Sequence, residues 1–196
     1  MRNPEATKER ILRQSGTLFN TQGYKATSIS DITKATGFTK GAIYRHFKSK
    51  DELEMESLSH LSSIMFEHLR VRIKSEKTAQ DKLKAIFHYF ETYITKPPVK
   101  GGCPLMNVAI EADDAHPSLR KRAVTILNIL RDSILTILEN GKKYGQVRPT
   151  IDSQHYATVI IAALEGAIMM SKLRGDDSDI TRVILHLDAM MKDIMI

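Results

Sequence analysis

Apolar residues recur every three or four positions along most of the chain, the spacing that places them on one face of a helix. This pattern predicts an all-α fold with about nine helices and no strand. The predicted helices cover approximately residues 5–21, 28–36, 40–47, 49–73, 78–94, 104–112, 117–140, 153–173 and 178–193.

Two of these helices, over residues 28–36 and 40–47, are only about two turns long. Ser28 can accept a hydrogen bond from a first-turn amide of the first helix, and Thr39 is placed to cap the second. Gly37 ends the first helix and forms the turn between them. Two short helices joined through a glycine turn predict a helix-turn-helix, whose second helix enters the major groove of DNA.

The faces of this helix pair differ in chemistry. Ile32, Ile43 and Phe47 have the spacing needed to pack the two helices together. Small side chains let a helix approach base edges, whereas aromatic and cationic ones donate hydrogen bonds to phosphates or bases. Side chains of these kinds occupy the outward positions of the second helix, which are Lys40, Gly41, Ala42, Tyr44, Arg45 and His46.

Charge is concentrated at the N-terminus. Residues 1–50 hold ten Lys/Arg and three Asp/Glu, a net charge of +7, whereas the remaining residues hold nineteen and twenty. The first quarter is therefore expected to meet a polyanion. Membrane phosphate is the alternative to DNA, but the basic segment divides into short helices instead of one long amphipathic helix.

The segments Gly23–Ile32 and Gly37–Leu53 closely resemble the TetR family of bacterial regulators, a similarity that covers about the first 55 residues. The resemblance implies a homodimer that binds a palindromic operator, usually as a repressor released by a small molecule. It also implies a DNA-binding domain over residues 1–52 and an effector-binding and dimerisation domain over residues 53–196.

The family pattern implies which side chains contact DNA. Groove contacts fall on Lys40, Gly41, Ala42 and Tyr44. Phosphate contacts fall on Thr27, Thr39, Tyr44, Arg45, His46 and Lys50, and Arg45 is an alternative base contact. With the capping residue Ser28, the expected DNA-binding set is Thr27, Ser28, Thr39, Lys40, Gly41, Ala42, Tyr44, Arg45, His46 and Lys50.

The last two predicted helices are apolar on more than one side, so each needs a second cover. Pairing of these helices about a two-fold axis is expected to supply it. The expected dimer interface is Ile160, Ala163, Leu164, Ala167, Ile184, Leu187 and Met191. An effector cavity is expected to be lined by Phe66, Phe87, Phe90 and Met106, each of which could also be an ordinary core residue.

Cys103 is the single cysteine, which excludes an internal disulfide and fits a reducing cytoplasm. It precedes Pro104 at a predicted helix start, where a helix dipole lowers a thiol pKa. A buried structural cysteine is the favoured interpretation, and a thiol- or electrophile-sensing repressor is the alternative.

Other classes of function receive little support. No zinc-protease, nucleotide-loop or nucleophile motif occurs, so we expect no enzyme and no cofactor, although a helical enzyme or binding protein is the remaining alternative. Asp113, Asp114 and His116 could bind a metal but are better read as a solvated helix end. No signal peptide is recognised, and no apolar run is expected to be long enough to span a bilayer, which predicts a cytoplasmic protein without a membrane partner.

Overall fold

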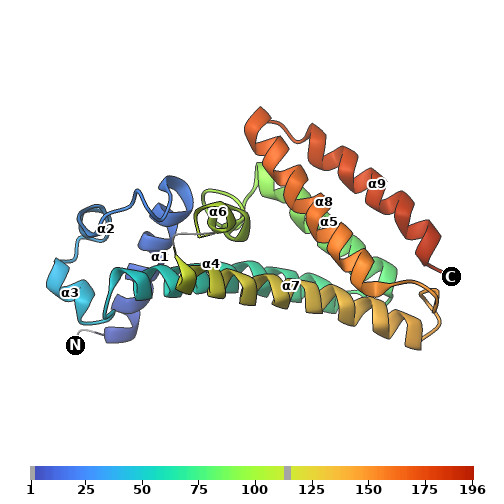
Figure 1. Ribbon diagram of the computed structural model, residues 1–196, viewed down its shortest axis with the longest axis horizontal. Coiled ribbons are helices and arrows are strands. Elements are labelled where there is room, and N and C mark those ends of the chain that lie inside the picture. Colours follow the sequence, from blue (N-terminus) through green and yellow to red (C-terminus); the bar gives the residue numbers. More distant parts are fainter. Residues whose placement is uncertain (1–2, 113–115) are drawn as a thin grey trace. The chain divides into compact units, whose positions relative to one another are not determined.

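The computed structural model describes residues 3–112 and 116–196, and within them it contains nine α-helices and no strand beyond one isolated bridge (Figure 1). The all-α prediction is confirmed. The helices are α1 (Pro4–Gln22), α2 (Ile29–Thr36), α3 (Lys40–Tyr44), α4 (Lys50–Ser75), α5 (Ala79–Thr95), α6 (Pro104–Glu111), α7 (Pro117–Lys143), α8 (Ser153–Arg174) and α9 (Ser178–Ile194).

The chain forms two compact units that are each discontinuous in sequence. The first unit comprises Met1–Met65 with Pro98–Ile126, and the second comprises Phe66–Pro97 with Leu127–Ile196. The long helices α4 and α7 each contribute residues to both units. This division differs from the sequential boundary between residues 52 and 53 that we expected.

The first unit packs α1 against α2 and α6. The rings of Phe19 and Tyr24 stack at 5.0 Å inside it, and both side chains are buried. Gly16 allows α1 to approach α4 closely, because a Cβ atom there would lie 3.0 Å from Cγ of Leu61.

The second unit is built around α5, α8 and α9, which pack against one another side by side (Figure 1). After α7 the chain turns back, and Val147 forms an isolated bridge with Met195. Gly141 makes this return possible, since a Cβ atom there would lie 2.4 Å from Cγ2 of Val147.

Helix α8 corrects one expectation. Its 22 residues are long and apolar enough to cross a membrane by length and composition, although no such segment was expected. A core helix meets the same criterion, and α8 packs against both α5 and α9 within its unit. Its apolar surface is therefore explained at least in part by contacts inside the second unit.

Candidate nucleic-acid interface

The first helix of the helix-turn-helix begins at a complete capping box. The Ser28 hydroxyl accepts a hydrogen bond from the Asp31 N–H at 3.2 Å, and the Asp31 carboxylate accepts from the Ser28 N–H at 2.9 Å. The Ser28 hydroxyl also donates to that carboxylate at 2.6 Å. These hydrogen bonds hold the pKa of Asp31 below its usual value, because they favour the ionised form.

The turn between the helices depends on glycine. Gly37 has a φ of 72°, and its N–H donates to the Thr33 carbonyl at 2.9 Å, which closes α2. Two residues later the Thr39 hydroxyl accepts from the Ala42 N–H at 3.2 Å and caps α3. Both predicted caps, Ser28 and Thr39, are therefore confirmed.

Helix α3 ends at Tyr44 and not at Phe47 as expected. The N–H groups of His46 and Phe47 both donate to the Ile43 carbonyl, so the last turn is tightened. Arg45 and His46 lie in this turn. The side chains of Ile32, Ile43 and Phe47 are buried, as expected for residues that pack the helix pair, and α2 contacts α3.

The outer side of α3 is exposed and cationic. Lys40, Gly41, Tyr44 and Arg45 are exposed, and Ala42 and His46 are partly exposed. The Lys40 ammonium lies 5.9 Å from the centre of the Tyr44 ring, which places the two side chains together on that surface.

Gly41 has no packing role in the described structure. It lies inside α3 and does not have a positive φ. A Cβ atom built on it would meet no heavy atom of the described chain within 4 Å. Glycine is unfavourable in a helix, and the absence of a side chain here leaves this face of α3 open to close approach.

Three residues of the expected DNA-binding set have other roles in this structure. Thr27 is fully buried, and its hydroxyl donates to the Gly23 carbonyl at 2.7 Å, so its side chain is not presented to phosphate. Ser28 is exposed but serves as the cap of α2. The Lys50 ammonium donates to the Tyr24 carbonyl at 2.9 Å and lies 3.1 Å from the Glu54 carboxylate, which leaves one of its three N–H donors for a phosphate.

The contacts that α6 makes with the end of α1 and with the segment leading into α2 were not predicted from the sequence. The Glu111 carboxylate accepts from the Lys25 N–H at 3.1 Å. It lies so close to Gly23 that a Cβ atom there would be 2.9 Å from Oε1, and Gly23 also has a φ of 96°. The Asn107 amide donates to the Asn20 carbonyl at 3.1 Å. Asn and Glu on a short helix carry no sequence signal that distinguishes such contacts from solvation.

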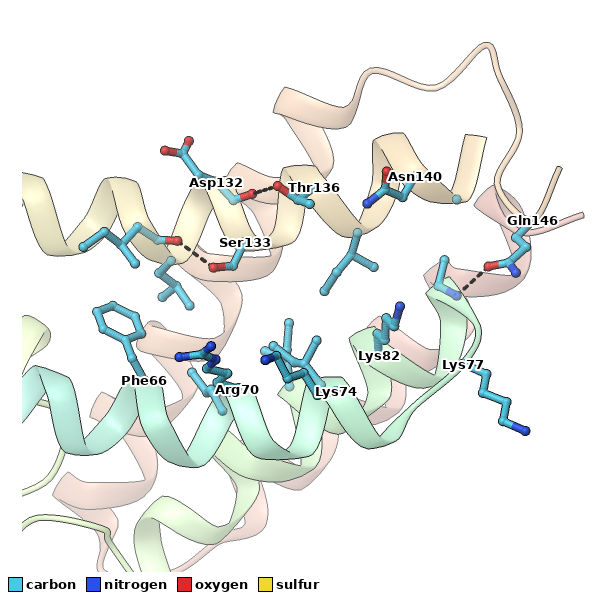
Figure 2. Close-up of a pocket in the computed structure, with 18 of the residues that line it drawn as sticks. Phe66, Arg70, Lys74, Lys77, Lys82, Asp132, Ser133, Thr136, Asn140 and Gln146 are labelled. Atoms are coloured by element: carbon cyan, nitrogen blue, oxygen red, sulfur yellow. Dashed lines mark hydrogen bonds between the residues drawn. The ribbon is translucent and has the colours of Figure 1, made fainter. Parts of the chain in front are cut away.

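A cavity of about 690 Å³ lies in the second unit, lined by residues of α4, α5 and α7 with Gln146 (Figure 2). Phe66, one of the residues expected to line an effector cavity, belongs to its lining. The expectation is corrected for the other three residues. Phe87 and Phe90 are buried in the core of this unit outside the cavity lining, and Met106 belongs to the first unit.

The structure also corrects the expected dimer interface. Of the seven residues, only Ala163 is partly exposed. The other six are core residues of the second unit, at most 4% exposed, because α8 packs against both α5 and α9: Ile160, Leu164, Ala167, Ile184, Leu187 and Met191. The apolar residues that remain exposed on these helices are Ala162, Met169, Met170, Leu173, Leu185 and Ala189.

Cys103 precedes α6 and is fully buried, an environment that matches a structural thiol. Asp113 and Asp114 lie outside the described residues, and His116 directly precedes α7. Among the described residues no group of three His, Cys, Asp or Glu is arranged to hold a metal ion.

Comparisons with known proteins cover both ends of the chain. Residues 11–54 match the model for bacterial regulatory proteins of the tetR family, and residues 79–187 match that for the tetracyclin repressor-like C-terminal domain. The chain is similar to a TetR transcriptional regulator from Chloroflexus aurantiacus, with 36% identity, full coverage of both chains and a TM-score of 0.95. A TetR-family regulator from Cytophaga hutchinsonii has 27% identity, covers 100% of this chain and 98% of its own, and gives a TM-score of 0.92. An HTH-type transcriptional regulator from Lactococcus lactis has 28% identity over 89% of this chain and 87% of its own.

Proposed function

Because the chain belongs to the TetR family of bacterial transcriptional regulators, we propose that it is a repressor that binds a palindromic operator as a homodimer and is released by a small molecule. The family consists of DNA-binding regulators, not enzymes. The proposal therefore concerns which residues read DNA, how two copies pair and what the cavity does.

The observation that carries the proposal is the outer side of α3. It combines the exposed cations Lys40 and Arg45 with Gly41, whose missing side chain faces open space. We infer that Lys40, Gly41, Ala42 and Tyr44 face the major groove. Thr39, Arg45 and His46 are placed to contact phosphates beside it, and Lys50 adds one N–H donor.

Pairing of two copies is proposed to use the exposed apolar side of α8 and α9. Met169 and Leu173 on α8 are 44% and 82% exposed, and Leu185 on α9 is 65% exposed. An isologous contact between two such surfaces would bury these side chains about a two-fold axis. A two-fold axis also matches a palindromic operator, whose half-sites lie about 34–36 Å apart.

The cavity of the second unit is proposed to hold the effector. Its volume of about 690 Å³ is within the range of small-molecule sites, about 300–1,000 Å³. An effector that binds more tightly to the DNA-incompetent state of the dimer shifts the population away from the operator-bound state. Such a regulator acts where the genome is, which supports a cytoplasmic location.

Selection of bound fragments from a genomic DNA library by the purified protein tests the proposal. We expect recovery of a palindromic sequence whose affinity falls steeply as salt rises. Lys40→Ala and Tyr44→Ala should weaken binding to that sequence without loss of helicity. Lys96→Ala is a matched control, because Lys96 is exposed at the end of α5 in the second unit. Recovery of no common sequence, or equal affinity of all three variants, would refute the assignment of α3.

A further inference from the structure

We propose that the cavity of the second unit binds an organic anion with an apolar body. This inference rests on the proposed function, since it names the chemical class of the effector.

The floor of the cavity is apolar. Leu69, Ile86, Leu130 and Ile137 line it and are at most 6% exposed, so they form a fixed surface within the core of the unit. Phe66 adds an aromatic wall. A ligand that fills this space gains by burying apolar surface, at roughly 25 cal/mol per Å².

Cations surround this floor on one side. Arg70 and Lys74 lie one turn apart on α4, and Lys82 lies on α5. Figure 2 shows all three side chains directed into the space between α4 and α7. Lys77 belongs to the same lining but its side chain points away from the cavity, as does the carboxylate of Asp132 (Figure 2).

Within the described residues these cations have no ion-pair partner. Throughout residues 3–112 and 116–196, none of the ion pairs involves Arg70, Lys74 or Lys82. Lys142 near the end of α7, in contrast, pairs with Glu139 at 2.9 Å. Like charges one turn apart on a helix repel each other, so an anion bound between Arg70 and Lys74 would relieve that repulsion.

Two hydroxyls of the opposite wall, those of Ser133 and Thr136, already donate within α7, whereas the side-chain amide of Asn140 on the same wall is a neutral donor. The Ser133 hydroxyl donates to the Ile129 carbonyl at 2.8 Å, and the Thr136 hydroxyl donates to the Asp132 carbonyl at 2.7 Å. The carbonyl of the Gln146 side chain accepts from the Ala79 N–H at 2.7 Å. The donors open to a ligand are therefore the three cations and the neutral amides of Asn140 and Gln146, and only the cations favour an anion by charge.

This set of donors selects among ligand classes. The guanidinium of Arg70 can hold a carboxylate, sulfonate or phosphate through two parallel hydrogen bonds. A cationic ligand would meet three like charges, and a neutral apolar ligand would leave the cations without a partner. An anion with an apolar body satisfies both the floor and the charged side.

A matched pair of fluorescent probes tests this inference on the purified full chain without DNA. Anilinonaphthalenesulfonate is an apolar body with one sulfonate, and phenylnaphthylamine is the same body without the charge. We expect the sulfonate to bind about tenfold more tightly than the amine, and only its binding should weaken between about 0.1 M and 1 M salt, as the Debye length falls from about 10 Å to 3 Å.

Substitutions assign the binding to this cavity. Arg70→Gln and Lys74→Gln should each weaken binding of the sulfonate about threefold, and together about tenfold, without effect on the amine. Lys77→Gln is the control, because it also removes one charge at the rim, but the Lys77 side chain points away from the cavity. Arg70, Lys74 and Lys77 are all exposed. Their substitution should therefore change binding and leave the fold intact, which circular dichroism checks.

Equal affinity for both probes would overturn the inference, and so would an equal effect of Lys77→Gln and Arg70→Gln. Operator binding is measured separately on the same preparations. Loss of anion selectivity with operator binding retained refutes the inference alone. Anion selectivity without any sequence-selective DNA binding refutes the proposed repressor function and leaves the cavity chemistry supported.

Discussion

Gly41→Ala should raise the stability of the protein while it weakens operator binding. The backbone at Gly41 is helical, without a positive φ, and an added Cβ would meet no heavy atom of the described residues within 4 Å. Alanine therefore fits the folded chain without strain. The only obstacle to the added methyl group is the DNA that we place against α3.

The two effects have opposite signs and separate origins. Alanine restricts the unfolded chain more than glycine does, which should raise the free energy of unfolding by about 0.4–1 kcal/mol. For a chain of this size that corresponds to an increase in Tm of about 1–4 °C. A methyl group at the groove surface should lower operator affinity by about tenfold or more, which is about 1.4 kcal/mol.

Thermal denaturation followed by circular dichroism measures the first effect, and fluorescence anisotropy with labelled operator measures the second. A higher Tm with unchanged operator affinity would show that DNA does not lie against Gly41. A lower Tm would refute the conformational argument itself.

Three further predictions concern other parts of the chain. Burial raises the pKa of the Glu54 carboxyl, so the protonated Glu54 side chain contributes stability below the usual pKa of 4.5, and this contribution is lost as pH rises through the raised pKa. The Tm of Glu54→Gln should therefore rise relative to that of the unmodified chain as pH increases, and the opposite trend would refute this. Asn107→Ala should lower the free energy of unfolding in urea by about 2 kcal/mol, because it removes the donor to the part-buried Asn20 carbonyl and side-chain oxygen. An unchanged midpoint would contradict these contacts. Leu185→Lys should convert the proposed dimer to the 22.1 kDa monomer in sedimentation equilibrium, whereas Val71→Lys, at a similarly exposed apolar residue of α4, should leave the dimer intact. A dimer in both variants would place the interface elsewhere.

Local sequence patterns predicted the helix-turn-helix well because its determinants are local. Ser28 and Thr39 cap their helices through side chains within three residues, and Gly37 ends α2 through its own φ. The end of α3 was misplaced for a related reason. Arg45 and His46 are compatible with a helix, and nothing in their identity predicts that two N–H groups share the Ile43 carbonyl.

Residues whose role depends on distant packing could not be assigned. An apolar helix such as α8 does not reveal which of its faces is covered within the chain, so Leu164 and Ala167 were placed at a dimer interface although α5 and α9 bury them. Phe87 is aromatic and lies on the apolar face of its helix, but residues of the core share both properties with residues that line a cavity. The cations of the cavity were missed because Arg70 and Lys74 look like ordinary solvated charges until α7 is placed opposite them.

The contacts that α6 makes with the end of α1 and with the segment leading into α2 have an evolutionary consequence. Asn107 contacts the end of α1 through both the main-chain carbonyl and the side-chain oxygen of Asn20, whereas Glu111 holds the following segment through a main-chain group, the Lys25 N–H, with Gly23 beside it. A contact made to the main chain does not depend on the side chain of the residue it holds. Mutations at residue 25 can therefore accumulate without loss of the Glu111 contact, whereas a side chain at position 23 would require a change at position 111.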